Sequence, residues 1–143
     1  MQTIPEIVNF FNDNKVFILT ENRPFFTFAD IKNQIYWTKV FFVDQQILKT
    51  DTIAIILENG PEMASCFISI ASNCCAAPLN PSYTSFEFNY YLNDLKPRAI
   101  IVSEKSTSSV IEVAKKMKIK IFRLFFKNND ASGKFILKSD KCE

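Results

Sequence analysis

The segment CCAAPLNPSYTSFEF, residues 74–88, decides how the chain leaves a sheet and enters a helix. A short strand is expected at 76–79. Pro78 has no amide hydrogen to give to a neighbouring strand, so this strand must lie at a sheet edge or end there. Pro81 fixes a second backbone φ angle, which makes the following turn stiff.

The next residues predict a capped helix. Thr84 and Glu87 form the pattern T-x-x-E, in which each side chain accepts a hydrogen bond from the other residue's amide. Lys96 should end the helix, because the residue before Pro97 avoids the helical region. The apolar face of this helix consists of Phe88, Tyr91, Leu92 and Leu95.

Outward from this segment, strand and helix patterns alternate. TIAIIL is a continuous apolar run rich in β-branched residues, which is typical of a strand buried on both faces of a parallel sheet. Strands are expected at 16–20, 25–28, 52–57, 76–79, 99–102, 119–126 and 134–138. Helices are expected at 4–13, 29–48, 61–73, 84–96 and 106–118, the last with Ser106 as its cap. The alternation predicts an α/β fold with a largely parallel sheet flanked by helices, and a first hairpin closed by ENRP.

Two helices carry patterns with more than one interpretation. In 29–48, one stripe is Ile31, Ile35, Thr38 and Phe42, and a second is Tyr36, Val40, Val43 and Ile47, which predicts burial on more than one side. In 61–73, Ser65, Ser69 and Ser72 share a face. That face fits a small-residue seam packed onto the sheet, or a polar groove.

Composition excludes several function classes. The 143 residues suit one domain, and they include no histidine, which excludes Ser-His-Asp triads and histidine-containing zinc sites. The net charge of +2 gives no reason to expect nucleic acid as a partner. The uncharged stretch 63–86 is interrupted by two prolines and two asparagines, so no membrane span is expected.

The cysteines and the chain ends predict an intracellular, cytoplasmic protein. Cys66, Cys74, Cys75 and Cys142 form no C-x-x-C pair and are expected to be buried, reduced thiols. The N-terminal MQTIPEIVNFF lacks the basic region of a signal peptide, and the final KCE is not a peroxisomal address.

Four stretches carry a family resemblance, in the same order and spacing. FFTFADI (25–31), TDTIAIIL (50–57), the run 57–102 and DASGKFILKSD (130–140) resemble the N-terminal part of AMP-forming acyl-CoA synthetases, the adenylate-forming ligases. The last stretch is most similar to the oxalate–CoA ligase-like branch. The resemblance implies the family's N-terminal subdomain over 1–143 and a role in fatty acid or related carboxylate metabolism.

The resemblance also implies what lies elsewhere in such enzymes. Complete members use ATP, Mg²⁺ and CoA, held by a glycine-rich phosphate loop, an acidic magnesium ligand and a C-terminal lobe with a catalytic lysine. None of these motifs occurs within residues 1–143, and no cofactor is expected for the chain alone. Glycines that the family places near Gln46, Leu48, Thr50 and Cys74 are replaced here, which strains any turn that needs a positive φ angle.

No residue is therefore assigned a catalytic, cofactor-binding or metal-binding role. SEKSTSSV (103–110) lacks glycine and fits a capped helix start better than a phosphate site. Glu87 and Asp94 lie on one solvated helix. Two functions remain open: the N-terminal portion of a carboxylate–CoA ligase, inactive alone, or a free-standing non-catalytic interaction domain. The expected partner is the rest of the ligase, a docking protein or a second copy, bound through a phenylalanine-rich face.

Overall fold

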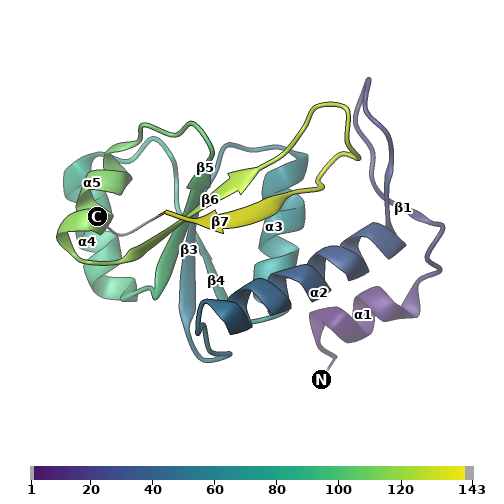
Figure 1. The fold of residues 1–143 in the computed structure, drawn as a ribbon, viewed down its shortest axis with the longest axis horizontal. Coiled ribbons are helices and arrows are strands. Elements are labelled where there is room, and N and C mark those ends of the chain that lie inside the picture. The colour runs from purple at the N-terminus through teal and green to yellow at the C-terminus, as the bar shows by residue number, and fades with distance from the viewer. Residues whose placement is uncertain (1, 141–143) are drawn as a thin grey trace.

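The computed structural model describes residues 2–140 and confirms the α/β fold (Figure 1). The helices are α1 (Ile4–Phe10), α2 (Phe28–Asp44), α3 (Pro61–Ala71), α4 (Ser85–Leu95) and α5 (Ser109–Lys116). The strands are β1 (Val16–Ile18), β2 (Phe26–Thr27), β3 (Thr52–Ile56), β4 (Cys75–Pro78), β5 (Ala99–Ser103), β6 (Lys120–Phe125) and β7 (Ile136–Ser139). Within 2–140, no helix is both long and apolar enough to cross a membrane.

Five strands form the main sheet in the order β4-β3-β5-β6-β7. The first four are parallel, and β7 runs antiparallel beside β6. Strand β4 lies at the edge with Pro78 opposite Ile55, as the missing amide hydrogen requires. Strands β1 and β2 pair as the expected hairpin, separate from this sheet.

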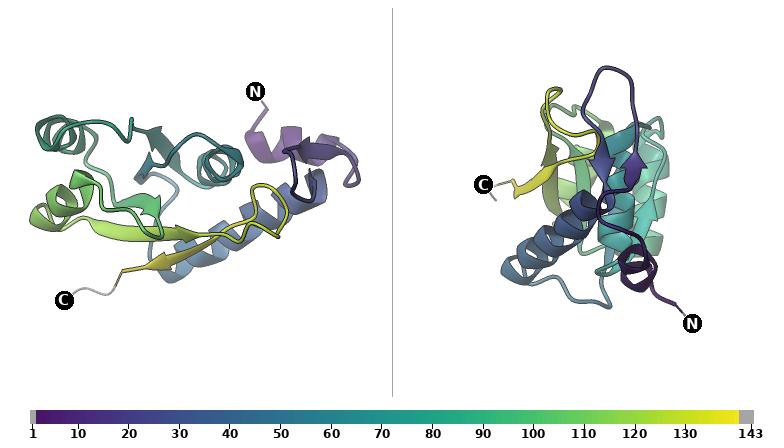
Figure 2. Two further views of the ribbon diagram at one scale, coloured as in Figure 1. Left: turned by 90° about the horizontal axis from the view of Figure 1, so that it is seen from above. Right: turned by 90° about the vertical axis from the view of Figure 1, so that its right-hand side faces the viewer.

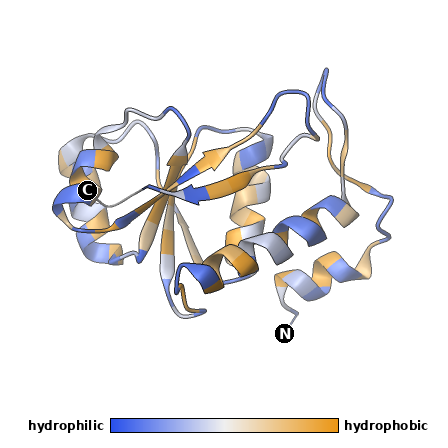
Figure 3. Ribbon diagram, in the orientation of Figure 1, coloured by the Kyte–Doolittle hydropathy of each residue, from blue (hydrophilic) through white to orange (hydrophobic). Residues whose placement is uncertain are grey.

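The sheet is buried on both faces, and alternate residues of β3 show it. Ile53 and Ile55 point into the cluster that contains Phe42 of α2 and Cys66 of α3. Ala54 and Ile56 point into the opposite cluster, which contains residues of α4 and α5. In the left view of Figure 2 the strands run between these two groups of helices. Figure 3 shows the resulting concentration of hydrophobic residues along the central strands.

The opening segment folds as its sequence predicts. Thr84 Oγ1 accepts from the amide of Glu87 at 3.2 Å, and Glu87 Oε2 accepts from the amide of Thr84 at 2.7 Å. Phe88 and Leu92 of the same helix are buried in the core. The edge strand, the stiff turn and the capping box thus place α4 on the sheet.

The expected cap of α5 is wrong. Ser108 caps α5 in place of Ser106, because its Oγ accepts from the amide of Val110 at 3.2 Å. Ser106 instead accepts from the amide of Ser108 in the preceding turn. Lys96 ends α4 before Pro97 as expected, and it leaves the right-handed helical region by adopting the left-handed one, with φ of 47°. Its amide donates to Leu92 O at 2.9 Å, which ends the helix in a manner usually reserved for glycine.

One replaced glycine does leave a strained turn. Gln46 has φ of 60°, just where the chain leaves α2 for β3. Leu48 and Thr50, at the other two replaced positions before β3, are not among the residues with positive φ. A residue with a Cβ atom is destabilised in the left-handed region, because its Cβ lies too close to the following carbonyl oxygen.

We predict that Thr84→Ala lowers the free energy of unfolding by about 1 kcal/mol, because the amide of Glu87 loses its acceptor. Urea denaturation of both forms measures the difference. Ser85→Ala is the matched control, since it changes a neighbouring helical hydroxyl outside the capping box. Equal unfolding midpoints for Thr84→Ala and the unchanged chain would contradict the prediction.

We predict that Gln46→Gly raises the free energy of unfolding by about 0.5 kcal/mol, because relief of the left-handed strain exceeds the added flexibility of the unfolded chain. Thr50→Gly is the control and should destabilise, since Thr50 gains flexibility without losing strain. Thermal or urea unfolding distinguishes the two. A loss of stability in Gln46→Gly equal to that in Thr50→Gly would refute the strain.

Candidate functional site along helix α2

The polar clusters considered as candidate sites, at Glu87 and at 103–110, cap helices. Glu87 holds the start of α4, and Ser108 holds the start of α5. Asp94 is exposed on α4. Over residues 2–140, no three or more His, Cys, Asp or Glu side chains gather as a metal-binding group would require. These clusters therefore give no basis for assigning a catalytic residue.

The serine face of α3 is a close-packing seam, as the first interpretation predicts, but Ser65 does not pack onto the sheet. Ser65 is buried and donates through Oγ to the carbonyl of Gly133 in the loop before β7. Gly133 has φ of 109°, and a Cβ there would lie 3.1 Å from Pro61 O. It is Cys66 and Ile70 that face the sheet. Ser65 thus holds in place the loop that leads into β7.

An ion pair ties the N-terminal hairpin to the same loop. Arg23 Nη1 lies 2.6 Å from Glu62 Oε1, and both side chains are nearly buried. Arg23 also donates to the carbonyl of Ala131 at 3.2 Å and lies over the ring of Phe126. Glu62 sits in the first turn of α3, where the helix dipole favours a negative charge. The hairpin, α3 and the loop at 126–131 are therefore held at one point.

Helix α2 differs from the sequence expectation. Its first stripe is at least partly buried, but of the second only Ile47 is buried, and it lies beyond the helix end at Asp44. The exposed side chains are Tyr36 (57% exposed), Trp37 (62%), Val40 (41%) and Val43 (70%), here called the α2 ridge. The prediction of burial on more than one side is therefore wrong. One side of α2 packs on the molecule, and the opposite side carries apolar residues in contact with solvent.

The exposed phenylalanines do not build this surface. Phe10, Phe25, Phe86 and Phe126 are exposed, but they come from four separate segments. Phe26, Phe42, Phe88, Phe122 and Phe135 lie in the core. The abundance of phenylalanine thus serves folding to a large extent, and the apolar surface on α2 is made of tyrosine, tryptophan and valine.

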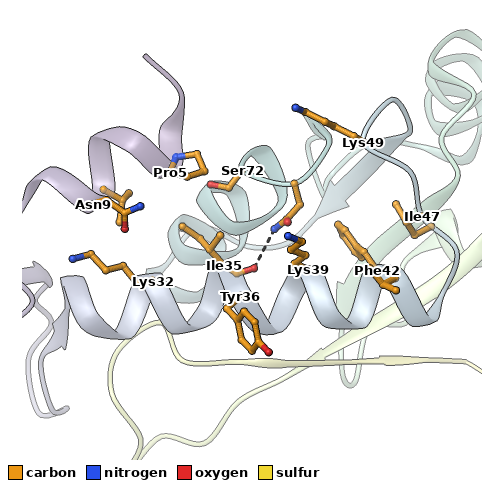
Figure 4. A pocket seen from close by; sticks show the side chains of 13 residues that line it. Pro5, Asn9, Lys32, Ile35, Tyr36, Lys39, Phe42, Ile47, Lys49 and Ser72 are labelled. Atoms are coloured by element: carbon orange, nitrogen blue, oxygen red, sulfur yellow. Dashed lines mark hydrogen bonds between the residues drawn. The ribbon is translucent and has the colours of Figure 1, made fainter. Parts of the chain in front are cut away.

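A groove of about 540 Å³ lies on one side of the α2 ridge, between α1, α2 and the end of α3 (Figure 4). We call it the lysine groove. Figure 4 shows Ile35, Lys39 and Phe42 on the side of α2 that faces the groove, with Lys49 across from them. A hydrogen bond of 3.2 Å from Asn73 Nδ2 to Ile35 O joins α3 to α2 at its base. The lining residues are Pro5, Val8, Asn9, Lys32, Ile35, Tyr36, Lys39, Phe42, Val43, Ile47, Lys49, Ser72 and Asn73.

A second groove, of about 400 Å³, lies on the other side of the ridge, between α2 and β7. We call it the β7 groove. Gln34 closes its base: Nε2 donates to Phe135 O at 3.0 Å, and Oε1 accepts from the amide of Phe135 at 3.2 Å. The lining residues are Gln34, Trp37, Thr38, Val40, Phe41, Asp44, Phe135, Ile136 and Leu137.

The two grooves differ in charge. Three lysines and no acidic residue line the lysine groove, and Lys32 is already paired with Asp13. Among residues 2–140, the only charged residue that lines the β7 groove is Asp44. In the described chain, neither Lys39 nor Asp44 takes part in an ion pair. Helix α2 thus presents an apolar ridge with a positive margin and a negative margin, which is suited to contact with another polypeptide.

Comparison with known proteins identifies the family. The AMP-binding enzyme family matches residues 11–140. The chain belongs to this family. Its members are adenylate-forming enzymes that include CoA ligases, as the resemblance in the four sequence stretches implies.

Two curated relatives are oxalate–CoA ligases. The protein from Saccharomyces cerevisiae is 33% identical over 103 residues, which cover 67% of this chain and 19% of that protein. The protein from Arabidopsis thaliana is 34% identical over 77 residues, covering 53% of this chain and 15% of that protein. The match thus spans less than a fifth of the length of either curated relative.

Solved structures share the fold at low identity. MatB from Rhodopseudomonas palustris superposes with a TM-score of 0.73 at 18% identity, over 85% of this chain and 25% of that one. A benzoate CoA ligase from Burkholderia xenovorans gives the same TM-score and coverage at 11% identity. The fold is therefore that of the N-terminal domain of adenylate-forming ligases.

The cysteines are less uniformly buried than expected. Cys66 is buried, Cys74 is partly buried, and Cys75 is exposed; Cys142 lies outside the described residues. Burial raises the pKa of the Cys66 thiol. Burial, followed by the charges of Cys75 and Asp51, raises the pKa of Cys74 to about 12.

We predict that Cys74 reacts with iodoacetamide far more slowly than exposed Cys75 at pH 8, because the thiolate is the reacting form. Raising the pH toward 11 should speed Cys74 labelling by about tenfold per unit, since its pKa lies above that range. Peptide mass spectrometry in a Cys142→Ser background measures both sites, with Cys75→Ser as the control that isolates Cys74. Equal labelling of the two thiols at pH 8 would contradict the raised pKa.

Proposed function

We propose that this chain is the N-terminal portion of an ATP-dependent carboxylate–CoA ligase, which forms an acyl adenylate and then an acyl-CoA. The observation that carries the proposal is the family match over 11–140, together with a fold shared with other ligases of this kind. In this function residues 1–143 supply a folded support and a contact surface. The remaining part of the ligase supplies the chemistry.

The proposal rests on what adenylation requires. Transfer of the α-phosphate of ATP to a carboxylate needs donors and cations that neutralise charge on phosphate oxygens. The sequence has glycine only at positions 60 and 133, and Gly133 is packed against Pro61 and Ser65. ATP, Mg²⁺ and CoA are therefore assigned to residues of the ligase outside this chain, and the chain alone is proposed to be inactive.

The acid is proposed from the curated relatives. Both are named oxalate–CoA ligases, which makes oxalate the first carboxylate to test. The chain itself offers no assigned acid-binding residue. The acid is therefore proposed from the names of the relatives alone. A chimera with one of those relatives tests the choice.

A second function is supported by the exposed α2 ridge. A free-standing, non-catalytic domain that binds a partner through this surface would need the ridge and its two grooves but no nucleotide site. The two functions differ in whether the chain can replace its counterpart in an active ligase.

We predict that the 143-residue chain binds ATP·Mg²⁺ no more tightly than millimolar and releases no pyrophosphate with oxalate or other acids. Calorimetry and a pyrophosphate assay test the chain alone. A chimera in which this chain replaces the matching segment of the Saccharomyces cerevisiae oxalate–CoA ligase should release pyrophosphate with oxalate and form oxalyl-CoA.

The same ligase without that segment is the control, and it should be inactive. A folded chimera without activity would favour the interaction domain. Turnover by the 143-residue chain alone would overturn the assignment of the chemistry to other residues.

A further inference from the structure

The α2 ridge has the spacing of a coiled-coil seam. Tyr36, Val40 and Val43 are separated by four and then three positions, which is the alternation of the two apolar positions in a heptad. All three are exposed, and they lie on the side of α2 opposite its buried residues. In the left view of Figure 2, α2 runs along the outside of the molecule beside β7. A second helix can therefore approach the ridge along its length.

The residues on either side of Tyr36, Val40 and Val43 carry opposite charges. They stand at heptad positions e and g, whose charges decide which helix pairs with α2 and in which direction. Lys39 precedes Val40 and occupies heptad position g, and Asp44 follows Val43 and occupies position e. In a parallel pair of helices, position g of one chain faces the position e that is five residues further along the other chain. Lys39 and Asp44 are separated by five residues, so two copies of α2 in parallel form the same ion pair twice.

The charges also exclude the reverse orientation. In an antiparallel pair, each margin of α2 faces the same margin of the other copy. Lys39 would then lie on the side occupied by Lys39 of the second copy, and Asp44 would face Asp44. Like charges across an interface are unfavourable, so the pattern selects the parallel pair.

We propose that the α2 ridge is a homodimer interface, in which two copies of this chain pack their α2 helices in parallel about a two-fold axis. Val40 occupies position a of this heptad. Asn33 occupies the preceding position of the same kind, where a polar residue fixes register. Trp37 of each copy lies on the margin that faces the other copy's lysine groove, which has room for an added side chain.

The area predicts a weak dimer. Tyr36 and Trp37 are each more than half exposed, and together they contribute about 250 Å² per chain. With the two valines and the neighbouring Ile136, the interface covers on the order of 500 Å² per chain, or about 1,000 Å² in total, at the lower limit for a specific interface. An interface of this size belongs to the weak, transient class, so the dimer is expected to dissociate on dilution.

This inference goes beyond the proposed function, because it needs neither ATP nor a carboxylate. It concerns the 143-residue chain, whose α2 ridge no other described segment covers. The pyrophosphate assay and the dimerisation assay therefore fail independently of each other.

Sedimentation equilibrium of the full chain between 1 and 200 µM, with reductant to prevent disulfides through exposed Cys75, should show a monomer–dimer equilibrium. Lys39→Glu alone and Asp44→Lys alone should each weaken homodimers by about tenfold or more, because each places like charges opposite one another twice. A mixture of the two variants should form heterodimers as tight as the unchanged dimer, because both pairs are then attractive. Native mass spectrometry with one variant ¹⁵N-labelled identifies the heterodimer.

Val43→Glu should abolish the dimer, while Tyr90→Glu, a matched change at an exposed position of α4, should leave it intact. Circular dichroism confirms that each variant is folded. The proposal is overturned if the unchanged chain stays monomeric at 200 µM, or if the mixed variants form no heterodimer. It is equally overturned if the ridge instead binds a separately expressed part of the ligase as a monomer, with Val43→Glu removing that binding.

Discussion

The fold depends on one constraint: strands β3 and β5 bury both of their faces. Ile53, Ile55 and Ile101 lie in one core cluster, and Ala54, Ile56 and Ile100 lie in the other. A parallel sheet of this kind is stable only if helices cover both sides. The chain meets the requirement with α2 and α3 on one face and α4 and α5 on the other. Each helix that connects two strands must therefore cover one particular face of the sheet.

Covering the sheet requires only one side of α2. Its buried residues cover β6 and the end of β3, with Phe41 and Phe42 against Phe122. The opposite side has no sheet to cover, yet it carries Tyr36, Trp37, Val40 and Val43. An amphipathic helix at the surface normally presents polar residues to water. The apolar ridge on α2 is therefore the surface that we propose as an interface with another polypeptide.

The ridge is held rigidly by contacts far apart in the sequence. Gln34 is hydrogen-bonded to both backbone groups of Phe135, which fixes β7 against α2. Gly133 permits the close approach of the preceding loop to Ser65, and Arg23 joins that loop to Glu62. A contact surface on a rigid support loses less conformational entropy on binding than one on a loose loop. The N-terminal hairpin thus helps to hold the loop before β7 in place without lining either groove beside α2.

The sequence by itself determined the alternation of strands and helices, the Thr84–Glu87 cap and the family, because each depends on neighbouring residues or on patterns along the chain. For β4 it left two possibilities, an edge strand or a strand that ends at Pro78, and the sheet order decided for the edge. The left-handed conformation of Lys96, the cap at Ser108 and the exposure of the α2 ridge required the tertiary structure. The spacing of Tyr36, Val40 and Val43 indicates that they share a side of a helix. Whether that side meets a sheet or water depends on where distant strands place the helix, and periodicity contains no information about that position.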